Sequence, residues 1–199
     1  MYQKSGRAAT HSPFARRCVS QKMLTTTFSR IAPLLFLAAT AFAQTAAPPN
    51  PCTLPQQKQF DFWVGAWDAT WPGQNAGEVG HGTNSIKRIL GDCIVQENFT
   101  DLTASGMRGM SVSIFEPNSG HWKQTWVDNQ GGYLDFTGDF KDGQMILQRE
   151  FARPDGAHVM QRMVWKNITA ADFDWSWESS TDSGKTWKVN WPIHYKRKR

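Results

Sequence analysis

The chain has 199 residues, of which 13% are aromatic and 20% are charged, and it contains ten tryptophans. Its formal charge is +5, but six of the 22 basic residues precede residue 44 and all 17 acidic residues follow it, so the remainder carries −1. A nucleic-acid-binding protein needs a basic face on its folded domain. No such face is visible in residues 44–199, so we expect no nucleic-acid partner.

The first 43 residues have the pattern of a leader and a secretory signal peptide. An apolar run over 31–40 follows Arg30 and is too short to span a bilayer. It ends in a small-x-small pattern that predicts cleavage after Ala43. Met23 is a more natural start than Met1, because it gives the signal peptide a basic segment of ordinary length. We expect an exported protein, periplasmic or secreted, with no membrane span in the mature chain.

The three cysteines agree with export. Cys18 lies in the leader, so the mature chain keeps Cys52 and Cys93. An even pair in an oxidising compartment predicts one disulfide, and the alternative is two free buried thiols. The bond would tie the N-terminal arm to the turn at Cys93 and contribute roughly 3–4 kcal/mol in the chain-entropy model. Residues 44–56, rich in alanine and proline, are the expected linker before the domain.

A dense aromatic stretch at residues 60–71 begins the folded domain. Before Gly65 the apolar residues suit a short helical turn, and after it Trp67 and Trp71 alternate with polar residues. Alternation with a period of two is typical of a half-buried strand. We expect a short helical plug that leads into a first strand at the closed end of a barrel.

Strand patterns then recur every 8–12 residues with turn-forming residues between them. The expected strands cover residues 67–71, 79–90, 94–100, 107–115, 122–127, 133–140, 145–151, 159–165, 173–178 and 187–195. About ten consecutive hairpins form an up-and-down meander, and closure into a barrel removes its two open edges. We predict an all-β, antiparallel barrel over residues 57–197 as one domain, with interior room for a ligand.

A resemblance to a known family rests on the motif FDFWVGAW at residues 60–67. This motif resembles the start of a mostly bacterial, often exported family, domain of unknown function 1579. The turn at 91–93, the segment 122–128 and the ending 180–187 fit the same pattern, and the resemblance spans residues 56–197. It implies a calycin-like β-barrel, related in shape to lipocalins and to the haem-binding nitrobindins. No catalytic residues are established for this family, so none carries over.

The aromatic residues provide the candidate ligand site. The tryptophans either fill the barrel or, in part, line a pocket for a flat or apolar ligand. Glu97 shares the parity of Val95 and Phe99, so it is the carboxylate expected to point inward, toward Arg149. Such a pair would either bind the polar end of a ligand or form a structural ion pair in which the two charges neutralise each other. The candidate ligand-binding residues are Trp63, Trp67, Glu97, Trp122, Trp126, Arg149, Trp175 and Trp177.

No cofactor is expected. Nitrobindin-like barrels hold haem through a histidine on a late strand, where His194 lies in this chain. It has the opposite parity from Trp187, Val189 and Trp191, so we expect it to point away from the interior. The other histidines are too scattered for a zinc site, and we predict no metal.

The residues at the end of the domain match an Asp-box hairpin: Ser180, Asp182, Gly184 and Trp187. In this motif the aspartate accepts backbone N–H bonds, the glycine is left-handed and the tryptophan packs under the loop. A propeller would need several copies, and only one is present. We interpret it as a structural hairpin and not as a sialidase site.

These patterns predict an exported barrel that binds a small apolar or aromatic ligand. One alternative is an isomerase, hydratase or cyclase that uses Glu97 or Asp128 for proton transfer, with Asp135 and Glu178 as weaker candidates. Another is an envelope interaction module with a solid core. A roomy apolar cavity favours binding, an unpaired carboxylate inside it favours catalysis, and no cavity favours the third. The sequence carries no known catalytic motif, and it does not indicate an oligomeric state.

Overall fold

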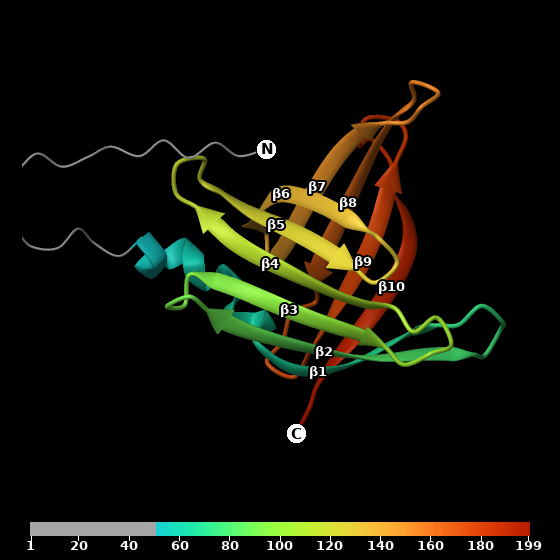
Figure 1. Cartoon of the computed structure of the whole chain (residues 1–199), viewed down its shortest axis with the longest axis horizontal. Coiled ribbons are helices and arrows are strands. Elements are labelled where there is room, and N and C mark those ends of the chain that lie inside the picture. The colour runs from blue at the N-terminus through green and yellow to red at the C-terminus, as the bar shows by residue number, and fades with distance from the viewer. Residues whose placement is uncertain (1–50) are drawn as a thin grey trace, which may run out of the picture. The chain divides into compact units, whose positions relative to one another are not determined.

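The computed structural model describes residues 51–199, which form a closed barrel of ten antiparallel strands (Figure 1). The strands are β1 (Gly65–Pro72), β2 (Val79–Ile89), β3 (Ile94–Asp101), β4 (Arg108–Glu116), β5 (His121–Asp128), β6 (Tyr133–Lys141), β7 (Gln144–Ala152), β8 (His158–Lys166), β9 (Asp172–Ser180) and β10 (Lys188–Arg197). Each strand pairs with the next in the chain, and β10 pairs with β1. The predicted up-and-down barrel is confirmed. The predicted signal peptide and the start of the linker lie outside the described residues.

One end of the barrel is closed by the chain that precedes β1. Two 3-10 helices, η1 (Pro51–Thr53) and η2 (Pro55–Trp63), lie at the ends of β2–β5 (Figure 1). Phe60 and Trp63 of η2 are 0% and 1% exposed. The Phe60 ring meets Trp122 edge-on, with centroids 4.7 Å apart. The predicted helical plug is therefore present, and we call this end the closed end.

The last residues of β10 also complete the closed end. Arg197 donates hydrogen bonds from Nη1 to the carbonyl of Val64 (2.9 Å) and from Nη2 to that of Phe62 (3.1 Å). Its guanidinium carbon lies 4.1 Å from the centre of the Trp67 ring. Gly65 has a φ of 142°, and a side chain there would collide with this guanidinium. The two ends of the domain thus meet over the plug.

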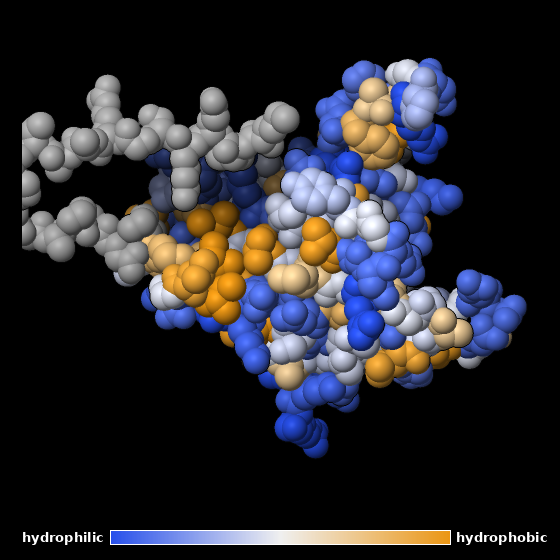
Figure 2. Space-filling model, viewed as in Figure 1, coloured by the Kyte–Doolittle hydropathy of each residue, from blue (hydrophilic) through white to orange (hydrophobic). Residues whose placement is uncertain are grey.

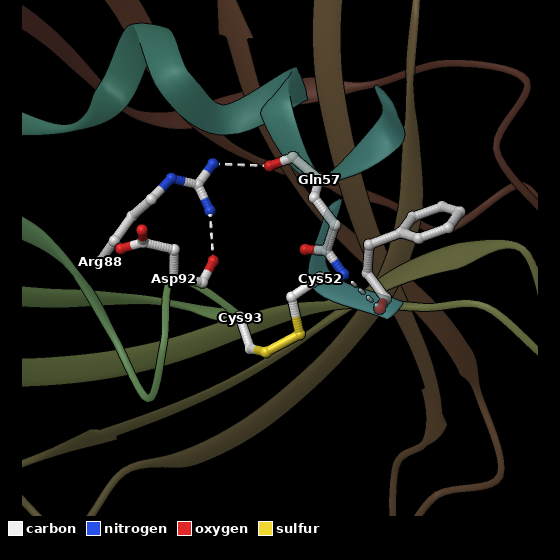
Figure 3. Close-up of a disulfide and its surroundings, with 6 residues drawn as sticks. Cys52, Gln57, Arg88, Asp92 and Cys93 are labelled. Carbon is white, nitrogen blue, oxygen red and sulfur yellow. Dashed lines mark hydrogen bonds between the residues drawn. A yellow bond between two sulfur atoms is a disulfide. The ribbon is translucent and has the colours of Figure 1, made fainter. Parts of the chain in front are cut away.

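A disulfide fastens the plug to the β2–β3 hairpin (Figure 3). Cys52 and Cys93 are bonded, with Cα atoms 4.8 Å apart, which confirms the predicted pair. Beside it, Arg88 donates to the carbonyl of Gln57 (2.6 Å) and to that of Asp92 (2.9 Å). The covalent bond and the arginine therefore join the same two segments.

A bulge in β10 changes which residues face inward. Val189 pairs with Glu178, but Trp191 pairs with Trp177, so an extra residue separates the two. The expectation that Trp187 and Val189 share a face with Trp191 is wrong, because the extra residue reverses the alternation. Val189 is 47% exposed.

The outer face of the barrel is mixed in character. Figure 2 shows polar and apolar side chains interspersed, with the largest apolar area of this view toward the closed end. Met110, Val112 and Val127 are exposed on neighbouring strands β4 and β5. In the part of the chain described here, no helix is both long enough and apolar enough to cross a membrane.

Candidate ligand-binding site

The barrel interior contains a cavity of about 240 Å³ that is partly open to solvent. Twelve of its fourteen lining side chains are aliphatic or aromatic, and the other two are Glu97 and Asp128. Five of them are indoles: Trp126, Trp165, Trp175, Trp177 and Trp191. Asp128 lies where β5 ends, at the barrel end opposite the plug, which we call the open end. A cavity of this volume has room for a small molecule, so the interior is not a solid core.

The indoles hold one another in fixed orientations. Trp175 and Trp191 meet edge-on at 5.8 Å between ring centroids, with an interplanar angle of 88°. Trp177 meets Phe136 in the same way at 5.7 Å. Edge-to-face pairs are the favoured geometry of aromatic rings, because the positive edge of one faces the negative face of the other. The walls of the cavity are therefore pre-formed.

Glu97 is the polar centre of the cavity. Its side chain is 8% exposed, and it accepts hydrogen bonds from Asn84 Nδ2 at Oε1 (2.6 Å) and from Ser111 Oγ at Oε2 (2.7 Å). Among the described residues no Lys, Arg or His forms an ion pair with it. Burial raises the pKa of this carboxyl to about 6, although the two hydrogen bonds act in the opposite direction.

Two further polar groups lie in the lining. The hydroxyl of Tyr195 is 3.4 Å from Asn84 Nδ2. Burial and then the charge of Glu97 raise the pKa of Tyr195 well above its usual value, so the phenol keeps its proton. Trp165 Nε1 is buried and has no acceptor among the described residues. The indole N–H of Trp165 is enclosed by protein atoms, so Tyr195 is the neutral polar residue that joins Glu97 in the cavity lining.

Asp128 is held in the turn that joins β5 to β6. Its carboxylate accepts hydrogen bonds from Trp126 Nε1 (2.9 Å), from the backbone N–H of Gln130 (2.9 Å) and from that of Gly132 (2.8 Å). Partial burial would raise its pKa, but the three hydrogen bonds together lower it below the usual value. Asp128 is thus an ionised group with a structural role in the turn.

The expected pair between Glu97 and Arg149 does not form. Three strands separate β3, which carries Glu97, from β7, which carries Arg149. Arg149 Nε and Nη1 are buried without an acceptor among the described residues, and its guanidinium carbon lies 4.9 Å from the centre of the Phe151 ring. Arg149 is not one of the residues that line the cavity.

The other predicted candidates fall into two groups. Glu97, Trp126, Trp175 and Trp177 line the cavity, whereas Trp63, Trp67 and Trp122 are fully buried at the closed end.

The remaining acid–base and haem candidates lie away from the cavity. Asp135 is exposed on the outer face of the barrel. Glu178 does not line the cavity either, and it is buried at 4% exposure in an ion pair with Arg162 at 2.6 Å. His194 points outward and bonds Asp174 at 2.8 Å.

Most of the apolar lining, and the hydrogen-bond partners of Glu97, were not among the predicted candidates. Trp165, Trp191 and Tyr195 line the cavity. Apolar alternation in the sequence indicates the inward parity of Trp191 and Tyr195, whereas Trp165 ends a continuous apolar run that has no period of two. Nothing in the sequence distinguishes Asn84, because its strand is polar and rich in glycine. Its importance follows only from its contact with Glu97.

The predicted Asp-box residues form a compact hairpin outside the barrel. Asp182 Oδ1 accepts the backbone N–H of Thr186 (2.9 Å), and Trp187 Nε1 donates to the carbonyl of Gly184 (3.0 Å). The Trp187 ring lies 4.0 Å from the guanidinium carbon of Arg162. The hairpin thus covers the outer ion pair of Arg162 and does not reach the cavity.

No group of three His, Cys, Asp or Glu side chains within residues 51–199 is arranged to hold a metal ion. The chain matches no protein-family model and no curated protein, so the resemblance to domain of unknown function 1579 stays a prediction. Among solved structures, it is similar to a crystallised protein of unknown function of the DUF3598 family from Nostoc punctiforme. The two share 9% identity over 73% of this chain and 100% of that chain, with a TM-score of 0.22. This similarity is too low to carry a functional argument.

Proposed function

We propose that this protein binds a small, flat, apolar or aromatic molecule inside its barrel. The observation that carries the proposal is the cavity of about 240 Å³ with five indoles in its lining. Apolar pockets with a few convergent polar groups are the usual form of small-molecule sites. A ring that enters the cavity beside these indoles would be buried on several sides without moving them.

The polar groups of the lining give the ligand a preferred orientation. Glu97 and Tyr195 belong to one cavity lining, and both carry oxygen atoms that can hydrogen-bond. A hydrogen-bonding substituent on the ligand that fails to reach them would be buried without partners, which is costly. We therefore expect a ligand with one polar substituent on an apolar body.

Native mass spectrometry of residues 44–199, purified from a periplasm, tests this function. We expect a retained small molecule that is lost in Trp191→Ala, which removes part of the cavity lining. The matched control is Trp187→Ala, because Trp187 packs outside the barrel on Arg162. If the mature protein retains nothing and also fails to bind apolar aromatic dyes, the proposal is wrong.

A second candidate function is favoured by Glu97 itself. A buried carboxylate without a cationic partner can take a proton from an activated carbon and return it to a neighbouring carbon, which is an isomerisation without a co-reactant. The test is deuterium exchange from heavy water into the retained molecule. Exchange with the wild type but not with Glu97→Gln supports proton transfer, and no exchange with either supports binding alone.

We also propose that the protein works outside the cytoplasm. The small-x-small pattern before Gln44 supports export, and the disulfide between Cys52 and Cys93 suits an oxidising compartment. Expression of the full chain in a bacterium, followed by N-terminal sequencing of the periplasmic fraction, tests this. A mature protein that begins at Gln44 is expected, and an uncleaved cytoplasmic protein would contradict it.

A further inference from the structure

The two charged side chains that line the cavity are both acidic, and Arg149, which lies on the inward side of β7 with Leu147, is not part of the lining. Of the fourteen described lining residues, Glu97 and Asp128 are acidic and none is Lys, Arg or His. Asp128 lies at the open end with its pKa lowered, so it presents a negative charge where a ligand enters. Acidic groups in a low-dielectric cleft focus the field and raise the local concentration of cations.

The aromatic lining also attracts cations. Each indole has a negative face, and a cation within about 6 Å of such a face is attracted by it, most strongly for tryptophan and away from water. Five indoles surround the cavity, and the Trp175 and Trp191 planes are nearly perpendicular at 88°. Rings at right angles present faces in different directions, as in the aromatic cages that hold ammonium groups.

Glu97 is not neutralised by its neighbours. Its two hydrogen-bond donors, Asn84 and Ser111, carry no formal charge, and both are buried at 2% and 1% exposure. A buried carboxylate that lacks a counter-charge is unfavourable, and a cation beside it removes that cost. The same cation would meet no basic side chain in the lining.

From these observations we propose that the cavity selects a small organic cation, an amine or quaternary ammonium on an apolar or aromatic body. Its charge lies beside Glu97 and its body lies among the indoles. This inference rests on the proposed binding function and specifies the ligand class of the same site. An anion would face Glu97 and Asp128, and a neutral molecule would gain only from burial.

Three probes of similar shape and different charge test the proposal by calorimetric titration of residues 44–199 at pH 7.5. They are benzyltrimethylammonium, its neutral carbon analogue neopentylbenzene, and phenylacetate. We expect the cation to bind at least about tenfold more tightly than the neutral analogue, and the anion to bind most weakly. A tightest affinity for phenylacetate would overturn the proposal and point to Arg149 as the anchoring group.

Glu97→Gln identifies the counter-charge, because it keeps the shape of the side chain and removes its charge. We expect it to lower affinity for the cation about tenfold or more while it changes affinity for the neutral analogue less than twofold. Glu150→Gln is the matched control, since Glu150 is exposed on the outer face of β7, and it should leave both affinities unchanged. An unchanged cation-to-neutral ratio in Glu97→Gln would refute the role of Glu97.

The possible failures are distinguishable. If none of the three probes binds the wild type, both the binding function and this inference are wrong. If the neutral analogue binds as tightly as the cation, binding stands and the charge selection is wrong. Thermal unfolding of each variant, with its disulfide intact, checks that a lost affinity does not reflect a lost fold.

Discussion

The two ends of the barrel differ in how completely their side chains are packed. At the closed end, Phe60, Trp63 and Trp67 are at most 1% exposed, and a disulfide and an arginine hold the plug. Toward the open end, half-buried indoles surround a cavity, and Glu97 is buried without a counter-charge. Stability is thus concentrated at one end, which allows the other to carry groups that cost stability but serve binding.

The largest expected effect is the loss of the plug ring. Phe60→Ala should lower the free energy of unfolding by about 3–5 kcal/mol, because the fully buried ring fills the space between Trp122 and Trp165. Trp191→Ala should cost less, although it removes more atoms, because one side of this ring faces the cavity. Denaturant titration measures both. Equal losses would show that the two ends are equally packed.

Removal of the disulfide tests whether the two ends are independent. The bond joins residues 41 positions apart, and its loss in Cys52→Ser with Cys93→Ser should cost about 3–4 kcal/mol. We expect the affinity for an apolar dye to change less than twofold at a temperature where the variant is folded. A parallel loss of dye affinity would mean that the closed end shapes the cavity.

Glu97 makes the free energy of unfolding depend on pH. The folded-state pKa of about 6 exceeds the ordinary value of 4.5, so the protonated carboxyl favours folding. This contribution is complete below pH 4.5 and is lost as the pH rises through 6, a difference of about 2 kcal/mol. Glu97→Gln should remove it, as seen in unfolding free energies measured at pH 4.5 and 7. Identical pH profiles for the two proteins would contradict this.

The lowered pKa of Asp182 does not obscure that measurement. Because its folded-state pKa of about 2 lies below the ordinary 3.8, the stability it provides is lost only as the pH falls through this lower range. The window used for Glu97 lies above it.

The smallest expected effect concerns one glycine at the closed end. Gly65 has a φ of 142°, and a methyl group would displace the flexible end of Arg197, so Gly65→Ala should cost about 1 kcal/mol. Gly156→Ala is the matched control, because Gly156 has a φ of 83° and no atom within 4 Å of an added methyl. Thermal unfolding compares them. If both variants lose the same stability, the contact with Arg197 is not part of what holds the closed end.

The sequence was sufficient to predict the barrel, the plug and the disulfide, because these depend on alternation, turn residues and cysteine count. Alternation also placed Glu97 on the inner face. It could not show that Arg149 lies across the barrel, since a period of two fixes the face of a residue and not its neighbours on distant strands. The bulge after Val189 was missed for a related reason, because one extra residue leaves no compositional trace.

The pairing of β1 with β10 has a consequence for how the chain reaches its fold. Trp67 pairs with Arg197, so β1 cannot complete its hydrogen bonds until the last residues of the domain are present. Contacts of such long sequence separation give a high contact order, and loop-closure entropy makes their formation slow. No part of the chain that lacks β10 can close the barrel. A nascent chain would therefore expose unpaired edges of β1 and β9 until β10 has left the ribosome.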